Sequence, residues 1–496
     1  MNLEHALAEI VERLDSQSEW LIVHSAGSAF SLKRDEIEFT LERDKIIFGF
    51  LDEKGFQIWR VAAYKIESAK LTFDLTRNFD RERERINIVP RVSAGELGAA
   101  VELARLEKAN KIARLIVSDN PKTKLIRVRL NEQNGRFAQI IFENRDAGQI
   151  AALADVSDVA APEMLLTTAI LWFSRLQMRT KKPIARIWIL AEKKLYKNLR
   201  RMHALLRADW QAKILIKEIS KTAKTPKVEI KSSPAIAFEN LWREKAPQSS
   251  LAATEKTSRM TSETIKLAPD EIDFVLTKHG ATLRFFGLPF ARVRQMPGEE
   301  KAWFGIERER RILNDATRED FFRLLDELKN YRRFDSPNKR HEFYRLAPEA
   351  WLEAILRRNV KLLDSNLVLS PIYNQFRAAR DKIDLLALRR DGRLVIIELK
   401  VEPDREMIFQ AVDYWRKIEL QRRGGNLQKA KIFGDLEISN EPAIVYLVAP
   451  TLSFHRDFEF LSKTISPEIE IYQFDLNENW RENLKVMKVG QVKTEN

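Results

Sequence analysis

Hydrophobic and polar positions follow two different periods along the chain, and the change of period divides it into regions. The first residues, MNLEHALAEIVERL, place apolar side chains on one face of a helix. Short runs such as EIEFTLERD and KIIFGFLD then alternate between turn residues, which predicts strands of a small antiparallel sheet. We therefore predict a β-rich N-terminal domain over residues 1–85.

Residues 86–220 predict an α/β domain, because helical and strand patterns follow one another there. A long helical pattern precedes the strands LIRVRL and FAQIIFE, and the turn between them contains Asn134-Gly135, a pair that favours tight hairpins. Residues 221–265 are rich in Ser, Thr, Lys, Pro and Ala, which predicts a linker. The apolar patch AIAFENLW interrupts this linker, either docked on a neighbouring domain or as a marginal helix.

Residues 266–346 predict a small α+β module with the helix PDEIDFVLTKH, strands around LRFFGLPFARV and AWFGIE, and the helix REDFFRLLDELKNYRR. Residues 347–496 predict the last domain, in which the patterns follow the order αβββαβ with an extra helix and strand at the end. The predicted fold class is therefore an α/β protein of several domains.

Three charged side chains gather in the last domain at positions where charge is costly. Asp391-Gly392 lies between two apolar runs and predicts a hairpin, with Asp384 near the start of its first strand and Glu398 and Lys400 at the end of its second. Side chains two residues apart share one face of a strand, so the hairpin can bring all three together. Two carboxylates can hold Mg²⁺ or Mn²⁺, and a lysine can orient the attacking water beside a phosphate. A salt-bridged hairpin is the alternative, and for Glu-x-Lys alone it is the better one.

With these residues the chain resembles the PD-(D/E)XK nuclease superfamily, and residues 349–420 resemble the nuclease domain of NucS-type endonucleases. The matching positions are Glu349-Ala-Trp-Leu352, Asp384, Glu398-Leu-Lys400 and Gln410-Ala-Val-Asp-Tyr414. The resemblance implies a restriction-endonuclease-like domain with the order αβββαβ. Ile383 stands where the name-giving Pro of the superfamily would be.

The resemblance also implies roles for the matched side chains. Asp384 and Glu398 would ligate the metal, and Lys400 would position the nucleophile. Gln410 and Tyr414, one turn apart on a helix, would contact the substrate backbone or support the lysine.

The helix glutamate is implied with two alternatives. Glu349 would ligate the metal directly or through water, and it is preferred because it precedes the Leu of the family pattern. Glu353 is one helical turn further along and is the alternative.

A basic and aromatic segment, KNYRRFDSPNKRHEFYR, lies immediately before the last domain. Lys and Arg can neutralise phosphates, and aromatic rings can stack on exposed bases. The residues predicted to bind nucleic acid are Arg332, Arg333, Lys339, Arg340, Tyr344 and Arg345. A solvated connector whose aromatic rings belong to the core is an equally weighted alternative.

Residues 86–220 invite a second comparison, because their patterns run in a similar order of helix and strand. Aligned on the two Gly-containing turns, Arg127, Ile141 and Glu143 fall at the places of Asp384, Glu398 and Lys400. No carboxylate pair survives in that alignment. A degenerate nuclease-like fold that serves binding or dimerisation and an unrelated α/β domain are equally weighted here.

Composition limits which partners and which metal ions the protein can be expected to bind. The chain has 85 Lys and Arg against 72 Asp and Glu, and the net charge of +13 favours an anionic partner such as nucleic acid. The absence of cysteine excludes disulfides, thiolate metal sites and cysteine nucleophiles. None of the six histidines forms a close pair at metal-ligand spacing, so a metal would be a hard cation held by carboxylates.

The sequence has no recognisable signal peptide and no apolar run of the roughly 20 residues that span a bilayer, so we expect no membrane partner and a cytoplasmic protein. The predicted function is a metal-dependent endonuclease that hydrolyses phosphodiester bonds in DNA. By resemblance, branched, mismatched or single-stranded DNA in repair or defence is the expected substrate, with RNA left open and a homodimer allowed. The alternative is a non-catalytic nucleic-acid-binding protein that keeps the nuclease fold.

Overall fold

The structure is a computed structural model, and it describes most of the chain. The described residues are 3–24, 29–42, 44–52, 55–67, 70–77, 82–91, 94–119, 122–157, 160–179, 182–221, 228–243, 258–277, 280–296, 299–306, 310–370 and 384–492. The chain forms two compact units, with residues 1–161, 173–195 and 217–232 in one and residues 162–172, 196–216 and 233–496 in the other.

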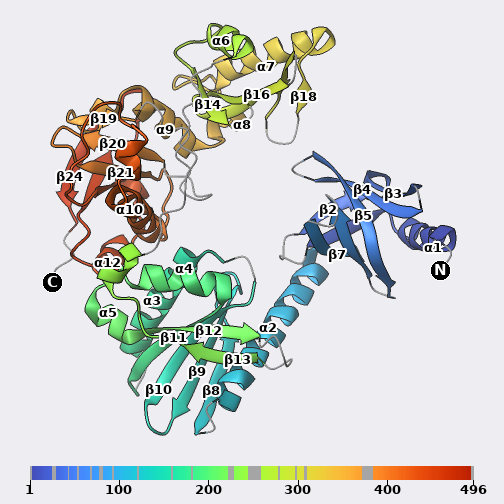
Figure 1. Cartoon of the computed structure of the whole chain (residues 1–496), viewed down its shortest axis with the longest axis vertical. Helices are drawn as coiled ribbons and strands as arrows, with labels where there is room; N and C mark the ends of the chain where they lie inside the picture. Colours follow the sequence, from blue (N-terminus) through green and yellow to red (C-terminus); the bar gives the residue numbers. More distant parts are fainter. Residues whose placement is uncertain are drawn as a thin grey trace. The chain divides into compact units, whose positions relative to one another are not determined.

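The N-terminal region is β-rich, as the alternating pattern predicts (Figure 1). Helix α1 (Leu3–Asp15) buries Ile10 and Leu14 in one core with Trp20, Phe48 and Phe73 of the sheet. The described strands form a seven-stranded antiparallel sheet in the order β2-β1-β7-β6-β5-β4-β3. Their bounds are β1 Glu19–His24, β2 Ala29–Lys33, β3 Ile37–Glu42, β4 Lys45–Asp52, β5 Gly55–Ile66, β6 Leu71–Arg77 and β7 Glu82–Pro90.

The end of this domain lies later than residue 85. Strand β7 continues to Pro90, because it pairs with β1 on one side and β6 on the other. Its burial alternates, with Ile86 and Ile88 fully buried, although charged residues between them conceal the pattern in the sequence.

The second region is an α/β domain, also as predicted. The described strands form a six-stranded sheet in the order β13-β12-β11-β10-β9-β8. The strands are β8 Thr123–Leu130, β9 Phe137–Asn144, β10 Gly148–Asp155, β11 Ile184–Glu192, β12 Ile214–Lys221 and β13 Val228–Ser232. The helices are α2 Ala94–Asp119, α3 Pro162–Arg179, α4 Lys193–His203 and α5 Ala208–Lys213. Strand β10 was not predicted, because its small residues (GQIAALAD) lack a strong strand pattern.

The predicted linker, residues 221–265, contains three ordered elements. Strand β13 pairs with β12, and the Ile230 N–H donates to Asp119 of α2. The 3-10 helix η2 (Phe238–Arg243) holds its Phe238 and Trp242 rings 6.0 and 5.8 Å from the ring of Trp415. The apolar patch therefore docks, one of the two alternatives given for it. Helix α6 (Arg259–Ile265) belongs to the next module, where Met260 and Ile265 pack on the core.

The third region is an antiparallel meander that helix α6 precedes and further helices follow. Its strands are β14 Ile272–Thr277, β15 Gly280–Phe285, β16 Leu288–Met296, β17 Glu299–Phe304 and β18 Arg311–Ile312. The 3-10 helix η3 (Asp315–Thr317), α7 (Arg318–Tyr331) and α8 (Glu342–Arg345) follow.

The predicted helix PDEIDFVLTKH is wrong, because most of it forms strand β14. Phe286 and Gly287, with φ of 40° and 77°, turn LRFFGLPFARV into the hairpin β15–β16. That hairpin offers an edge to β14, which pairs with β15 from Ile272 to Thr277. Pairing with a neighbouring strand therefore overrides the helical pattern.

The last region carries the predicted order αβββαβ. Its helices are α9 Pro348–Arg358, η4 Val360–Leu362, α10 Met407–Arg423, α11 Asn426–Lys429, η6 Thr451–Ser453 and α12 Phe458–Ser462. Its strands are β19 Leu367–Leu369, β20 Leu385–Arg389, β21 Leu394–Leu399, β22 Ile444–Pro450, β23 Ile471–Leu476 and β24 Val486–Gln491, in that order across the sheet. Helix α10 packs on β21 and β22. The final strand, β24, was not predicted.

The two six-stranded sheets have the same strand order. In each, the first three strands are antiparallel, the third and fourth are parallel, and the sixth is antiparallel to the fifth. A helix precedes the first strand, and another joins the third to the fourth. The hairpin β9–β10 therefore corresponds to β20–β21. The alignment on the Asn134-Gly135 turn is corrected, because that turn joins β8 to β9 and is one strand too early.

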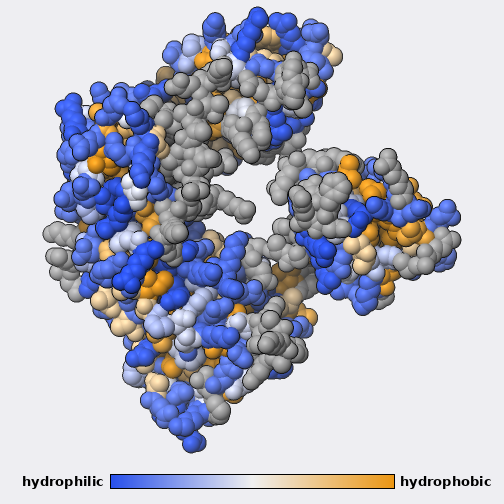
Figure 2. Space-filling view, in the orientation of Figure 1, coloured by the Kyte–Doolittle hydropathy of each residue, from blue (hydrophilic) through white to orange (hydrophobic). Residues whose placement is uncertain are grey.

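The molecular face drawn in Figure 2 is mostly hydrophilic, and its apolar residues form small separate groups. Among the described residues, no helix is both long enough and apolar enough to cross a membrane.

Candidate active site

The hairpin β20–β21 places the predicted carboxylates opposite each other. The two strands pair with Leu385 facing Ile397, and one further step in this register puts Asp384 opposite Glu398. The turn is closed by Gly392 at φ of 81° and by the Asp391 carboxylate, which accepts the Arg393 N–H. A short turn and a two-residue period are therefore sufficient to build this part of the site.

The Glu398 carboxylate is buried and only half satisfied. Its side chain accepts a hydrogen bond from Lys400 Nζ at 3.0 Å through Oε1, and Glu398 is 2% exposed. Its second oxygen, Oε2, is buried without a hydrogen-bond partner among the described residues. The neighbouring Asp384 is fixed from the backbone, since Leu399 N–H donates to its Oδ2 at 2.9 Å. An orphaned carboxylate oxygen in this setting is unfavourable unless a proton or a cation meets it.

Electrostatics show that three carboxylates act on one another here. Burial raises the pKa of Glu398 well above its usual range, and the charges of Asp384 and Glu349 raise it further, while Lys400 opposes them. Burial lowers the pKa of Lys400, but the charges of Glu398 and Glu349 outweigh it, so the net shift is upward. The lysine therefore stays protonated, and a divalent cation beside Glu398 would offset the burial and the like charges that disfavour its ionised form.

The two candidate helix glutamates have different surroundings. Glu353 is 2% exposed and lies 3.2 Å from Arg284 Nη1 and 3.5 Å from Arg357 Nη1. Two guanidinium groups therefore compensate its charge. Glu349, in the first turn of α9, is the helix carboxylate whose charge acts on Glu398 and Lys400.

The donor set suits a hard cation. Asp384 and Glu398 supply carboxylate oxygens, the ligands that Mg²⁺ and Mn²⁺ prefer, and the orphaned Glu398 Oε2 lacks any other partner among the described residues. The described residues contain no group of three or more His, Asp or Glu side chains that is set to hold a metal ion. A cation here would be held by Asp384 and Glu398, and Glu349 acts on Glu398 through its charge.

Gln410 and Tyr414 lie on α10, the helix that packs on β21. Both side chains are half-buried, and they stand one helical turn apart. Lys417 Nζ lies 5.5 Å from the centre of the Tyr414 ring. Helix α10 therefore carries Gln410 and Tyr414 on the sheet that holds Glu398. Ile383, noted in the sequence, lies outside the described residues.

Two acidic residues that the sequence pattern did not single out lie near the site, Asp404 beside Lys400 and Glu406 beside Asp404. Asp404 Oδ2 lies 3.5 Å from Lys400 Nζ, so the lysine is held between Asp404 and Glu398. The Glu406 N–H donates to Asp404 Oδ1 at 2.7 Å. Burial, together with a hydrogen bond to Asp404 and its charge, raises the pKa of Glu406 to about 7. The run VEPDRE directly after Glu-x-Lys was the available signal for both.

Arg332, predicted to bind nucleic acid, is a buried structural residue, and this prediction is corrected. Its side chain is 0% exposed, and its guanidinium lies 4.8 Å from the ring of Trp351. The guanidinium donates to backbone carbonyl oxygens of Phe285, Phe286, Phe343, Leu346 and Ala347. Burial lowers the pKa of Arg332 to about 9. All of its donors serve the fold, so none is offered to a phosphate.

The other residues of the basic segment fall into two groups. Tyr344 is half-buried, with its ring 5.6 Å from Trp351, and Arg333 is exposed but paired with Asp335. The remaining exposed cations among the predicted residues form no salt bridge with a described carboxylate; they are Lys339, Arg340 and Arg345. These three are the part of the predicted set that can meet a phosphate.

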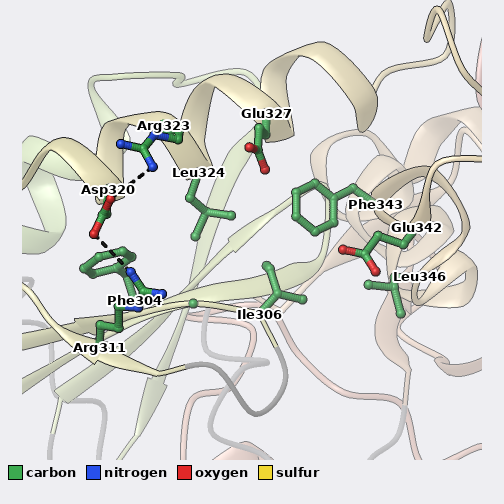
Figure 3. Close-up of a pocket in the computed structure, with 11 residues that line it drawn as sticks. Phe304, Ile306, Arg311, Asp320, Arg323, Leu324, Glu327, Glu342, Phe343 and Leu346 are labelled. Atoms are coloured by element: carbon green, nitrogen blue, oxygen red, sulfur yellow. Dashed lines mark hydrogen bonds and ion pairs between the residues drawn. The ribbon is translucent and has the colours of Figure 1, made fainter. Parts of the chain in front are cut away.

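A cavity of about 510 Å³ lies between β17 and helices α7 and α8, and neither Asp384 nor Glu398 lines it (Figure 3). Its floor is apolar, with Phe304 and Leu324 among its lining residues. Asp320 pairs with Arg311 and Arg323, and Glu327 and Glu342 add two more carboxylates. Three carboxylates and two arginines line this cavity, and both arginines are paired with Asp320, so the cavity offers a phosphate little unpaired positive charge.

Comparison with known proteins adds two distant likenesses. The chain matches no protein-family model, and no curated protein matches it. A structure of EndoMS in apo form is 11% identical over 40% of this chain and 90% of that chain, with a TM-score of 0.14. A structure of an EndoMS–dsDNA complex is 11% identical over 43% of this chain and 92% of that chain, with a TM-score of 0.17. TM-scores this low do not show that this chain shares the fold or the activity of EndoMS.

Proposed function

We propose that the last domain is a metal-dependent nuclease that hydrolyses phosphodiester bonds in DNA. The observation that carries this proposal is the buried, unpartnered Glu398 Oε2 beside Asp384 and Lys400. A fold that serves only packing gains nothing from an orphaned carboxylate among like charges. A site that binds a cation gains the ligand that it needs.

The side chains present can perform the steps of hydrolysis. A Mg²⁺ or Mn²⁺ ion held by Asp384 and Glu398, with Glu349 through water, would polarise the scissile phosphate and lower the pKa of the attacking water. Lys400, kept protonated by its carboxylate neighbours, faces the developing negative charge and orients the water. Asp404 and Glu398 hold the ammonium from two sides, which fixes its position.

The choice of DNA rests on charge and on position. Lys339, Arg340 and Arg345 are exposed directly before α9, the helix that carries Glu349. Together with the net charge of +13 they favour a polyanion whose phosphates they can neutralise. The proposal extends to branched, mismatched or single-stranded DNA, and RNA is the second substrate to test.

The test is cleavage of labelled duplex, single-stranded, flapped and mismatched DNA, with matched RNA, in Mn²⁺, in Mg²⁺ and in EDTA. We expect cleavage only with metal, and we expect Asp384→Asn to lower the rate by about 10³-fold, since it removes several kcal/mol of charge stabilisation. Asp435→Asn is the matched control, because the same change there alters a side chain that is 94% exposed. Cleavage that persists in EDTA or in Asp384→Asn would overturn the proposal.

A second readout separates the nuclease from its rival, a non-catalytic nucleic-acid-binding protein. Titration of Mn²⁺ followed by calorimetry should give binding to the wild type and weaker binding to Asp384→Asn. DNA retention without metal binding or cleavage would favour the rival.

A further inference from the structure

The shared topology of the two six-stranded sheets allows their positions to be compared. The last pair between β21 and β22 joins Leu399 to Val448, and the last pair between β10 and β11 joins Ala154 to Leu190. Val448 and Leu190 each lie two residues before the end of their strand. The two pairs therefore mark equivalent places in the two sheets.

This equivalence shows what the first sheet carries where the second has its candidate site. The places of Asp384, Glu398 and Lys400 are taken by Gln139, Leu153 and Asp155. A shift by one residue gives Ala138, Ala154 and Val156 instead, all apolar. Neither alignment yields a carboxylate pair with a lysine.

The side chains at these places in the first sheet serve the fold. Leu153 is 0% exposed, and Gln139 is 4% exposed and accepts a hydrogen bond from Arg129 Nε at 2.9 Å. The Asp155 carboxylate accepts from Ser157 N–H at 2.8 Å and from Ala160 N–H at 3.1 Å, which closes the turn before α3. The first sheet therefore has the strand order of the second but lacks the pair of facing carboxylates with a lysine at this place.

Equivalent connectors of the two sheets also meet, within the second compact unit. Residues 193–213 join β11 to β12, and residues 451–470 join β22 to β23. Leu206 and Ile465 form an antiparallel bridge, in which Arg207 N–H donates to Thr464 O at 2.9 Å and Ser466 N–H donates to Leu205 O at 2.8 Å. Both bridged side chains are buried.

We propose that this chain carries a pair of like-built domains with one hydrolytic centre among the described residues, and that it cuts one strand of duplex DNA at each binding event. The proposal rests on the nuclease function proposed above. A symmetric dimer presents two centres to the two strands of a duplex, whereas this pair presents one. In the single step, water adds to phosphorus, one P–O ester bond breaks, and the released hydroxyl takes the proton from water. The opposite strand stays intact.

The test is single-turnover cleavage of supercoiled plasmid with protein in molar excess and Mn²⁺ present. We expect the relaxed circle to accumulate before linear DNA appears. Linear DNA that forms directly from supercoiled plasmid would overturn the inference and leave the nuclease function standing. If no form of the plasmid and none of the labelled substrates is cut, the nuclease function itself fails.

Two controls show whether one centre is responsible. The mass of the protein at the assay concentration should be that of one chain, 57.8 kDa, whereas a stable dimer with two centres would contradict the inference. Asp155→Asn should leave the cleavage rate within about twofold, because it touches only the turn of the first sheet. A loss as deep as that of Asp384→Asn would show a second centre and overturn the inference.

Discussion

The sheets β8–β13 and β19–β24 have the same strand order, but they differ in the side chains buried at the end of the third strand. In the first, Leu153 and Ala154 pack at the end of the third strand, and the polar groups beside them are satisfied. In the second, Glu398 lies at that place with one carboxylate oxygen unpartnered among the described residues. The fold therefore does not require an acidic residue there, since the first sheet forms without one. The unpartnered carboxylate oxygen of the second sheet adds nothing to stability, which supports the functional role proposed for it.

The largest expected effect comes from making the second sheet resemble the first. Glu398→Gln should lower the rate of DNA cleavage in Mn²⁺ by about 10³-fold, because one of two charged metal ligands is lost. Rates of labelled-duplex cleavage measure this, with Glu459→Gln, at a side chain 84% exposed, as the matched control. Full activity in Glu398→Gln would show that Glu398 is not needed for cleavage, so the carboxylate that distinguishes the second sheet would have no catalytic role.

The reverse change should damage the first sheet. Leu153→Glu buries an uncompensated charge and should lower the free energy of unfolding by about 3–5 kcal/mol at pH 7. Leu153→Met, which keeps the volume, should cost less than about 1.5 kcal/mol. Urea denaturation in EDTA measures both. A Leu153→Glu protein as stable as wild type would mean that this place is not a core position.

Metal should stabilise the second sheet alone. Mn²⁺ at a hundred times its dissociation constant should add about 2.7 kcal/mol to the stability of the unit that binds it. Thermal unfolding with and without Mn²⁺ measures the shift, which should vanish in Asp384→Asn and persist in Asp155→Asn. A shift that survives Asp384→Asn would place the cation elsewhere.

The smallest effect concerns the acidic loop after β21. The pKa of Glu406 is raised to about 7, above its usual 4.5, so its contribution to stability is full below pH 4.5 and is lost as the pH rises through about 7. Glu406→Gln should therefore lose less stability than wild type between pH 5 and pH 8, by on the order of 1 kcal/mol for this half-buried group. Urea midpoints in EDTA at the two pH values measure the difference. Equal losses in both proteins would show that Glu406 does not titrate in this window.

The sequence determined the features that depend on short-range order. The turn at Asp391-Gly392 and the two-residue period of the strands were enough to predict the hairpin in which Asp384 lies opposite Glu398. The helical periods of α9 and α10 and the β-rich start of the chain were equally legible, because each is set by residues within one or two turns of each other.

Tertiary structure decided what depends on distant partners. Strand β14 forms because the hairpin β15–β16 offers it an edge to pair with. Arg332 is structural because carbonyl groups from two separate segments, residues 285–286 and 343–347, converge on it. Glu353 was set apart from Glu349 by Arg284, which is 69 residues away. The shared strand order of the two sheets could not be predicted from the sequence either. The order and direction of strand pairing depend on burial across the whole domain, and the local hydrophobic period does not record it.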